Sequence, residues 1–204
     1  KMENTWIWEG HEISWKKENG HNDASIAILL IHGFGGCKEH WRYNQKELSN
    51  LAPCYSIDLV GFGESSQPCS QLLYEGYKAK SFHYCFDNWS RQIVSFCKEI
   101  IQKPVLLIGN SIGAVIALNS SKNLTKKCLG VVLIDCAQRT MDDKRLIEQS
   151  LFMRFFRPVI KTLVRQRILS STIFKKAANP IFIEKILKVA YPSGKNINEE
   201  LINL

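Results

Sequence analysis

The chain has 204 residues, of which 45% are hydrophobic and 23% are charged, and its formal net charge is +8. These proportions are those of a globular domain with a core, and they exclude a disordered or fibrous protein. No apolar run approaches the roughly 20 residues that a membrane span needs. Polar and aromatic residues follow Met2, unlike the start of a secretory signal peptide. We therefore expect a cytoplasmic protein.

The cysteines and the basic residues bear on compartment and partners. The seven cysteines include no C-x-x-C pair, which favours reduced, mostly buried thiols in a reducing compartment. The basic surplus falls between Arg139 and Lys195. A solvated helix face is the favoured interpretation of it. The alternative is peripheral contact with an intracellular or thylakoid membrane surface. No nucleic-acid-binding motif is present, so no nucleic-acid partner is expected.

The first third of the chain predicts a hairpin and then two buried strands. Residues 5–8 and 12–17 alternate in polarity around a glycine turn, which is typical of a β-hairpin. Residues 26–31 form a continuous apolar run, as expected for a strand covered on both faces. Residues 41–51 have helical spacing, and residues 54–59 predict a second short strand.

The middle of the chain alternates between helical and strand patterns. This alternation predicts a mostly parallel sheet with helices on both faces, and the hairpin would lie at one edge. In order, we predict an irregular segment, a helix capped by Asp87, a buried strand, a helix of small residues and a fourth buried strand, at residues 66–84, 87–101, 105–108, 111–120 and 129–134.

The last part of the chain has helical periodicity alone, from residue 141 to residue 204. We interpret it as a helical cap inserted after a strand. The predicted domains are therefore an α/β core at residues 1–138 and a helical cap or lid at residues 139–204.

The segment GNSIG at residues 109–113 carries the predicted chemistry. It fits G-x-S-x-G and lies between a predicted strand and a predicted helix, which is the context that gives this motif its meaning. A sharp turn there lifts the hydroxyl of Ser111 clear of the sheet, and only small residues such as Gly109 and Gly113 fit beside it. Ser111 is the candidate nucleophile.

Two further glycine motifs precede this segment. Residues 32–36 read HGFGG after the first buried strand. An acyl-transfer enzyme needs two N–H donors for its oxyanion, and we assign them to the backbone of Phe34 and Ile112. His32 and Gly33 are interpreted as structural residues of this loop. Residues 58–65 read DLVGFGES, and we interpret them as architecture beside the pocket.

The three motifs together, in this order, resemble the α/β-hydrolase superfamily, and within it the branch of esterases, carbon–carbon hydrolases and epoxide hydrolases. Serine at position 111, where epoxide hydrolases carry aspartate, favours ester chemistry. Asn110, the segment VVLID at residues 131–135 and residues 179–191 resemble pheophytinases and chlorophyll dephytylases. The resemblance implies hydrolysis of a phytol-type or other long-chain ester beneath an apolar cap. It implies no metal and no organic cofactor.

The chain departs from this family pattern at its catalytic histidine. The family orders its triad as serine, acid and histidine, but the five histidines, at positions 11, 21, 32, 40 and 83, all precede Ser111. The strands that carry the usual acid and histidine are also missing. We therefore expect a C-terminally truncated fragment that is inactive by itself. Asp135 is an alternative position for the acid, although a turn residue is the favoured interpretation.

The leading prediction is a serine hydrolase of carboxylic esters whose partner is a small-molecule substrate, an apolar ester of the long-chain or phytol type. A carbon–carbon hydrolase or a cofactor-free haloperoxidase would use the same frame. A non-catalytic binding protein built on a degenerate hydrolase fold is the alternative from a different functional class.

Overall fold

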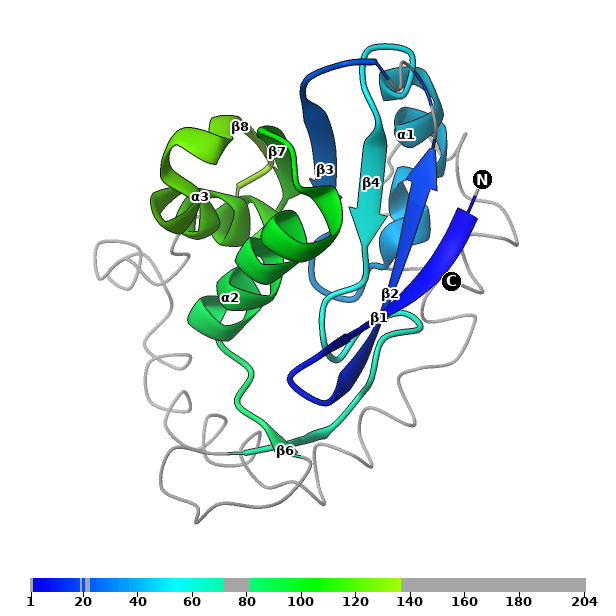
Figure 1. The fold of residues 1–204 in the computed structure, drawn as a ribbon. Helices are drawn as coiled ribbons and strands as arrows, with labels where there is room; N and C mark the ends of the chain where they lie inside the picture. The colour runs from blue at the N-terminus through cyan, green and yellow to red at the C-terminus, as the bar shows by residue number, and fades with distance from the viewer. Residues whose placement is uncertain (1, 19, 21–22, 72–80, 137–204) are drawn as a thin grey trace, which may run out of the picture. The chain divides into compact units, whose positions relative to one another are not determined.

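The computed structural model of the chain describes residues 2–18, 20, 23–71 and 81–136 (Figure 1). All of them belong to one unit, which spans Lys1–Gln138. The predicted helical cap at residues 139–204 and the basic surplus predicted there lie outside the described residues. The division of the chain into core and cap therefore stays a prediction.

The six strands of the central sheet are β1 (Met2–Trp8), β2 (His11–Glu18), β3 (Ala27–Ile31), β4 (Cys54–Ile57), β7 (Val105–Asn110) and β8 (Cys128–Ile134). Their spatial order is β1-β2-β4-β3-β7-β8. β2 is antiparallel to both β1 and β4, whereas β4, β3, β7 and β8 run parallel. The prediction of a mostly parallel sheet with an antiparallel hairpin at its edge is confirmed.

The hairpin turns at Glu9 and Gly10, whose φ angles are +49° and +79°. Positive φ at both central residues is typical of the two-residue turn whose twist matches that of the flanking strands. The predicted strands at residues 5–8 and 12–17 are present, and each extends further from the turn than predicted.

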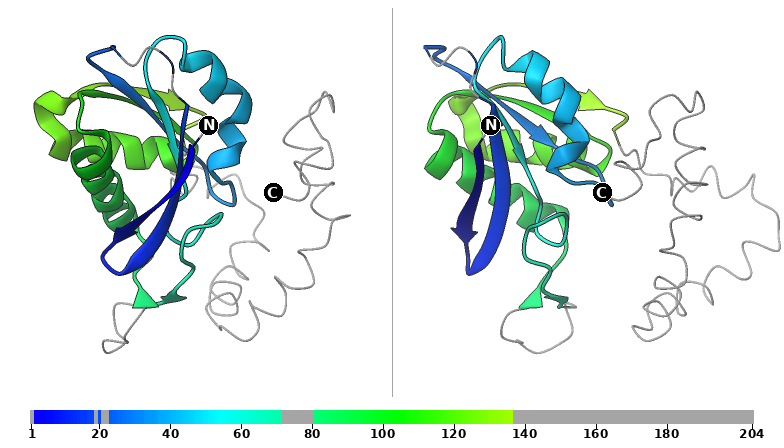
Figure 2. Two further views of the ribbon diagram at one scale, coloured as in Figure 1. Left: turned by 45° about the vertical axis from the view of Figure 1, so that its right-hand side comes forward. Right: turned by 90° about the vertical axis from the view of Figure 1, so that its right-hand side faces the viewer.

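The helices are α1 (Arg42–Leu48) after a 3₁₀ turn (Lys38–Trp41), α2 (Phe86–Phe96), and α3 (Ile112–Leu124) before a 3₁₀ turn (Thr125–Lys127). Figures 1 and 2 show α1 on one side of the sheet and α2 and α3 on the other. Each helix thus covers one face, as the predicted α/β architecture requires.

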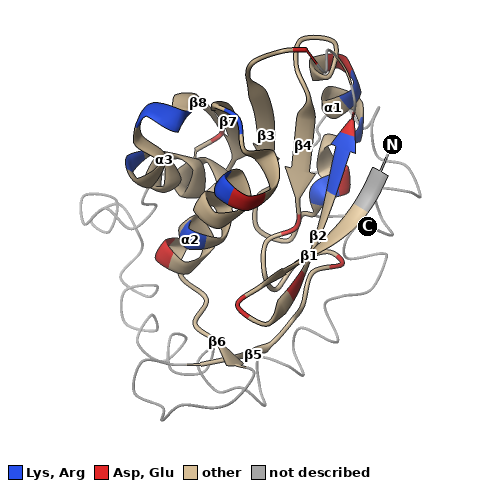
Figure 3. Ribbon diagram, viewed as in Figure 1, with Lys and Arg blue, Asp and Glu red and all other residues tan. Residues whose placement is uncertain are grey.

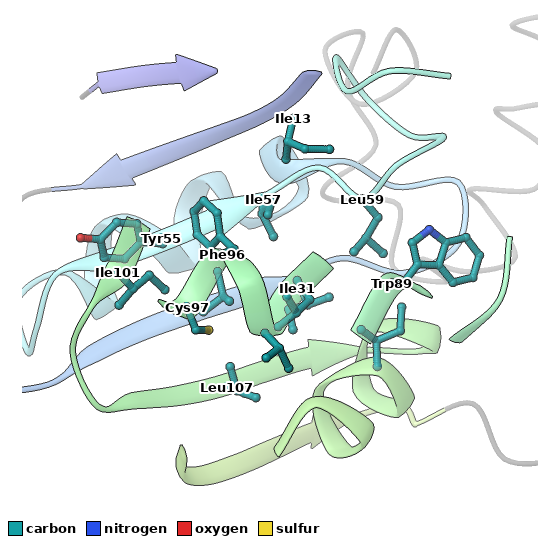
Figure 4. Close-up of a cluster of buried hydrophobic side chains, with 14 of the residues drawn as sticks. Ile13, Ile31, Tyr55, Ile57, Leu59, Trp89, Phe96, Cys97, Ile101 and Leu107 are labelled. Carbon is teal, nitrogen blue, oxygen red and sulfur yellow. The ribbon is translucent and has the colours of Figure 1, made fainter. Parts of the chain in front are cut away.

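The alternation of side chains along β3 explains why that strand is apolar throughout. Leu29 and Ile31 belong to the larger core cluster, which includes Phe96 of α2 (Figure 4). Ile28 and Leu30 point the other way, into a smaller cluster with Trp41. Successive residues of a strand face opposite sides of the sheet. In a strand covered on both faces every side chain is therefore buried, and every residue can be apolar.

Several predicted boundaries were wrong, and hydrogen bonding explains two of them. The predicted helix at residues 87–101 begins at Phe86 and ends its α-helical part at Phe96, with a π-helical turn (Cys97–Ile101) after it. Cys85, not Asp87, is its N-cap residue. The helix predicted at residues 41–51 stops at Leu48, where the backbone changes to bonds between residues three apart.

The strand predicted at residues 54–59 ends at Ile57, and the next two backbone donors after Asp58 bond to side chains from other segments. The N–H of Leu59 donates to Nε2 of His32 at 3.1 Å, and the N–H of Val60 donates to Oε1 of Gln92 at 3.1 Å. Within the segment predicted to be irregular, two-residue strands β5 (Cys69–Ser70) and β6 (Ser81–Phe82) pair with each other, and residues 72–80 lie outside the described part.

The burial predicted for the fourth strand was also wrong. Leu129, Leu133 and Ile134 of β8 are 53%, 44% and 37% exposed. In the part of the chain that the structure describes, β8 pairs with β7 alone and forms one edge of the sheet. The apolar sequence of β8 matches that of a covered strand, but its observed position is an edge.

All seven cysteines are free thiols. Burial raises the pKa of Cys54 and of Cys97 to about 12, so both stay protonated and act as apolar core residues. Lysine, arginine and acidic residues occur together on α1 and α2 (Figure 3). No helix in the described ranges is both long and apolar enough to cross a membrane.

Candidate active site

Ser111 occupies the junction between β7 and α3, which we call the elbow (residues 109–113). Its φ and ψ angles are +54° and −117°. Such a conformation costs a non-glycine residue on the order of 1–3 kcal/mol and persists only where the surroundings fix it. Here the N–H of Ser111 donates to the carbonyl oxygen of Ile134 at 2.9 Å, and its own carbonyl accepts from Ala114 at 3.2 Å.

Close backbone packing forces the elbow into this shape. A Cβ atom added at Gly109 would lie 2.2 Å from the carbonyl oxygen of Gly113. A Cβ atom added at Gly113 would lie 2.4 Å from the carbonyl oxygens of Ile31 and His32. The start of α3 thus rests directly on the end of β3, and this contact leaves no room for a side chain at either glycine.

The His32 loop (residues 32–38) lies beside the elbow. A Cβ atom added at Gly33 would lie 3.2 Å from Cβ of Ser111 and 2.9 Å from Oδ1 of Asn110. Phe34, the next residue, is 71% exposed. Ile112, on the other side of Ser111, is the first residue of α3, and the first N–H groups of a helix have no acceptor within that helix. The structure therefore places Gly33, the residue before Phe34, against Ser111, and Ile112 directly after it. The oxyanion role of Phe34 and Ile112 stays a prediction.

His32 fastens this loop and is fully buried. Its Nε2 accepts the N–H of Leu59 at 3.1 Å, so its Nδ1 carries the ring proton and donates to the carbonyl oxygen of Gly33 at 2.7 Å. Burial lowers the pKa of His32, and the bond to Gly33 offsets part of that effect. A neutral imidazole whose two nitrogens are both engaged is not available as a base for Ser111.

The Asp58 loop (residues 58–65) packs against the His32 loop. Asp58 is fully buried, and a Cβ atom added at Gly63 would lie 2.4 Å from its carboxylate. The ring of Phe62 contacts the rings of His32 and Phe34, with centroids 5.4 and 5.5 Å away. The two loops thus meet through aromatic rings next to the elbow.

Asp135 follows β8 and is exposed, with φ at +43°. Because Asn110 pairs with Ile134 in the sheet, Asp135 stands at the same end of the sheet as Ser111. Its strained backbone fits both a functional residue and a sharp turn. Its role as the acid stays a prediction.

The other histidines in the described ranges make contacts of their own. His11 packs edge-on against Phe82, and Nδ1 of His83 lies 2.9 Å from the carbonyl oxygen of Gln71. His40 packs against Trp41, and burial lowers its pKa. Within the described part, no cluster of three or more histidine, cysteine or acidic residues could hold a metal ion.

Sequence reasoning missed Gln92, whose amide is fully buried and joins two loops of the site. Its Oε1 accepts from Val60, and its Nε2 donates to the carbonyl oxygen of Asp58 at 3.1 Å. A signal was present, since Gln92 lies on the apolar face of α2 between Trp89 and Phe96. A polar residue at such a position is buried and must have a partner.

Comparison with known proteins agrees with this geometry. The sequence profile of the alpha/beta hydrolase fold matches residues 26–170. The 1-acylglycerol-3-phosphate O-acyltransferase ABHD5 of Rattus norvegicus is 30% identical over 136 residues, which cover 66% of this chain and 36% of the relative. The (lyso)-N-acylphosphatidylethanolamine lipase of Bos taurus is 27% identical over 108 residues, 53% of this chain and 29% of the relative.

Two solved structures share the fold. A bacterial membrane phospholipase A superposes with a TM-score of 0.61 at 22% identity, covering 92% of this chain and 51% of the other. The haloalkane dehalogenase DatA of Agrobacterium tumefaciens gives 0.64 at 16% identity, with 99% and 60% covered. The chain spans about a third of the curated relatives' length. With the elbow, the adjoining loops and the matched profile, this chain belongs to the α/β-hydrolase family.

Proposed function

We propose that this protein is a serine hydrolase of carboxylic esters with long apolar chains, with Ser111 as its nucleophile. The observation that carries the proposal is the strained backbone of Ser111, held between Gly109 and Gly113 and against the His32 loop. Strain of this kind is stored at functional sites, and this turn is the one that presents a nucleophile in the α/β-hydrolase fold.

The proposed reaction is acyl transfer through a covalent intermediate. The hydroxyl of Ser111 attacks the ester carbonyl, and the N–H groups of Phe34 and Ile112 donate to the oxyanion that forms. The base would be a histidine outside residues 1–204, as the family resemblance implies, because His32 is neutral and already bonded at both nitrogens. Asp135 would be one position for the acid that orients this base.

The names of the relatives support lipid esters as the substrate class. The two curated relatives are named for 1-acylglycerol-3-phosphate and for (lyso)-N-acylphosphatidylethanolamine, and one structural neighbour is a phospholipase A. The exposed ring of Phe34, which meets the ring of Phe62 edge-on, offers an apolar surface on the loop that contacts the elbow through Gly33. We therefore place acyl esters of glycerophospholipids ahead of the phytol-type esters.

A fluorophosphonate probe tests the nucleophile in the full-length protein. We expect labelling of the wild type and none of Ser111→Ala. Ser121→Ala is the matched control, since Ser121 lies on the same helix and bonds to Leu118, and this variant should label like the wild type. Hydrolysis of long-chain lysophospholipids, compared with phytyl esters, then tests the substrate class.

A second candidate function is a non-catalytic binding protein on the same fold. It is favoured by the histidines in the described part, none of which is placed to serve Ser111. This candidate predicts a folded full-length protein that neither labels nor hydrolyses esters. If the probe labels Ser111 but the protein cleaves carbon–carbon bonds or oxidises halides, a carbon–carbon hydrolase or a cofactor-free haloperoxidase is favoured instead.

A further inference from the structure

A buried ion cluster lies at the far end of the His32 loop. The side chain of Lys38 is 3% exposed, and its Nζ lies 3.3 Å from Oδ2 of Asp58 and 2.5 Å from Oε2 of Glu64. Asp58 is fully buried, whereas Glu64 is 71% exposed. The cluster thus runs from the interior to the surface. Sequence analysis assigned no role to Lys38 and included Glu64 only in a segment interpreted as architecture.

The carboxylate of Asp58 joins two loops by backbone hydrogen bonds as well. Its Oδ1 accepts the N–H of Lys38 at 2.5 Å, and its Oδ2 accepts the N–H of Glu64 at 3.0 Å. The N–H of Asp58 itself donates to the carbonyl oxygen of Ser14 at 2.9 Å. One buried side chain therefore fixes the end of the His32 loop and the end of the Asp58 loop relative to the sheet.

Phe34 lies between two anchors. His32 holds the near end of its loop through Gly33, and Asp58 holds the far end through Lys38. Phe62, which belongs to the Asp58 loop, also packs its ring against Phe34. The position of the Phe34 amide therefore depends on how the ion cluster sets both loops.

A cluster of this kind is a costly way to gain stability. Burying a lysine carries a large desolvation penalty, and well-packed apolar residues often stabilise a fold as well or better. Burial lowers the pKa of Lys38, but Glu64 and Asp58 raise it by more, so the net pKa is raised and the ammonium stays charged. Apolar residues in place of these side chains could not make the directional hydrogen bonds by which Asp58 holds the backbone at Lys38 and at Glu64.

We propose that Lys38, Asp58 and Glu64 are positioning residues for the reaction: together they hold the Phe34 amide where the oxyanion forms. The inference rests on the proposed function. None of the three touches the reacting atoms. Their effect should fall on kcat, because an oxyanion donor acts mainly on the transition state and little on substrate binding.

The test measures ester hydrolysis by Lys38→Met, Asp58→Asn and Glu64→Gln in the full-length protein. Removing one oxyanion donor costs about 100- to 1,000-fold in kcat, so displacing one should lower kcat about 10- to 100-fold and leave KM within about 2-fold. Glu64→Gln changes an exposed side chain, folds in any case, and should give the smallest loss. A Lys38→Met, Asp58→Asn double variant should lose no more than the worse single variant, since both act through one amide.

Gln45→Met is the matched control. Gln45 is buried and bonds to Lys16, Cys54 and Ser56, away from both loops. This variant should lose stability and keep its kcat. If the cluster variants behave like Gln45→Met, with lower stability and unchanged kcat, the positioning role is overturned while the hydrolase survives. If the folded wild type neither labels nor hydrolyses esters, the proposed function fails, and this inference fails with it.

Discussion

The elbow, which contains Ser111, and the His32 loop lie against each other, yet different interactions hold them in place. The elbow is shaped by backbone contact, since Gly109 and Gly113 leave no space for a Cβ atom and no side chain caps α3 at Ser111. The His32 loop is held by buried polar side chains at both ends. The elbow should therefore be sensitive to added volume, and the loop to lost hydrogen bonds and charge.

Gly113→Ala should produce the largest effect. The new methyl group would lie 2.4 Å from two carbonyl oxygens of the backbone, which cannot move away as a flexible side chain would. Overpacking of this kind costs about 3 kcal/mol of unfolding free energy, occasionally more. Urea unfolding of the full-length protein measures the loss, and labelling of Ser111 should fall with it.

Gly35→Ala makes the same chemical change in the His32 loop and is the control. A Cβ atom added there has nothing within 4 Å, although the φ angle is +71°. The expected cost is only the conformational penalty of alanine, about 1 kcal/mol. Equal losses for the two variants would contradict the contrast between a packed elbow and an open loop.

The sequence could predict the elbow because its determinants are local. The spacing of Gly109, Ser111 and Gly113 within a strand-to-helix junction contains nearly all of the geometry. The parallel sheet was equally predictable, because β3 and β7 are short apolar runs separated by helical patterns. Composition and periodicity need no knowledge of distant contacts to reveal either feature.

The polar anchors could not be predicted because they join segments far apart in the chain. Nothing near Lys38 indicates that its partners are Asp58 and Glu64, and Gln92 reveals its burial but not its partners. The exposed edge at β8 was mispredicted because apolar periodicity reports what a strand is suited to contact, not what lies against it. Local patterns thus predict elements, whereas loop positions depend on side chains from several elements.

His32→Leu should be the next largest change, and it removes hydrogen bonds from the His32 loop and the Asp58 loop. It leaves the N–H of Leu59 and the carbonyl oxygen of Gly33 without their side-chain partner in a buried site. Leaving a buried polar group unsatisfied costs about 1–3 kcal/mol, and at the lower end for each of the two groups we expect a loss of about 2 kcal/mol in urea unfolding. His11→Leu, at a partly exposed position on the hairpin, should change stability by less than about 0.5 kcal/mol.

Ser111→Gly and Ser111→Ala separate strain from chemistry at the elbow. Both remove the hydroxyl, so neither should label. Glycine tolerates positive φ and alanine does not, so the glycine variant should be the more stable by about 1 kcal/mol. Thermal unfolding of the two variants, compared side by side, measures the difference. Equal stability would mean that the backbone at position 111 is not strained.

The smallest effect is a pH dependence that should distinguish the loop from the elbow. Burial lowers the pKa of His32 below its ordinary value of 6.5. Below pH 6.5 the histidine is therefore protonated in the unfolded chain while it stays neutral in the folded protein. The contribution of His32 to stability is therefore complete above pH 6.5 and falls as the pH drops toward the folded pKa. The pKa of His40 is lowered as well, so the wild type alone cannot isolate the effect of His32.

Unfolding free energies at about pH 7.5 and 5.5 should differ less in His32→Gln than in the wild type. Gly113→Ala adds no titratable group and should keep the wild-type pH dependence. If His32→Gln also keeps it, the pKa of His32 is the same in the folded and unfolded protein, and the loop is not held by a histidine that burial keeps neutral.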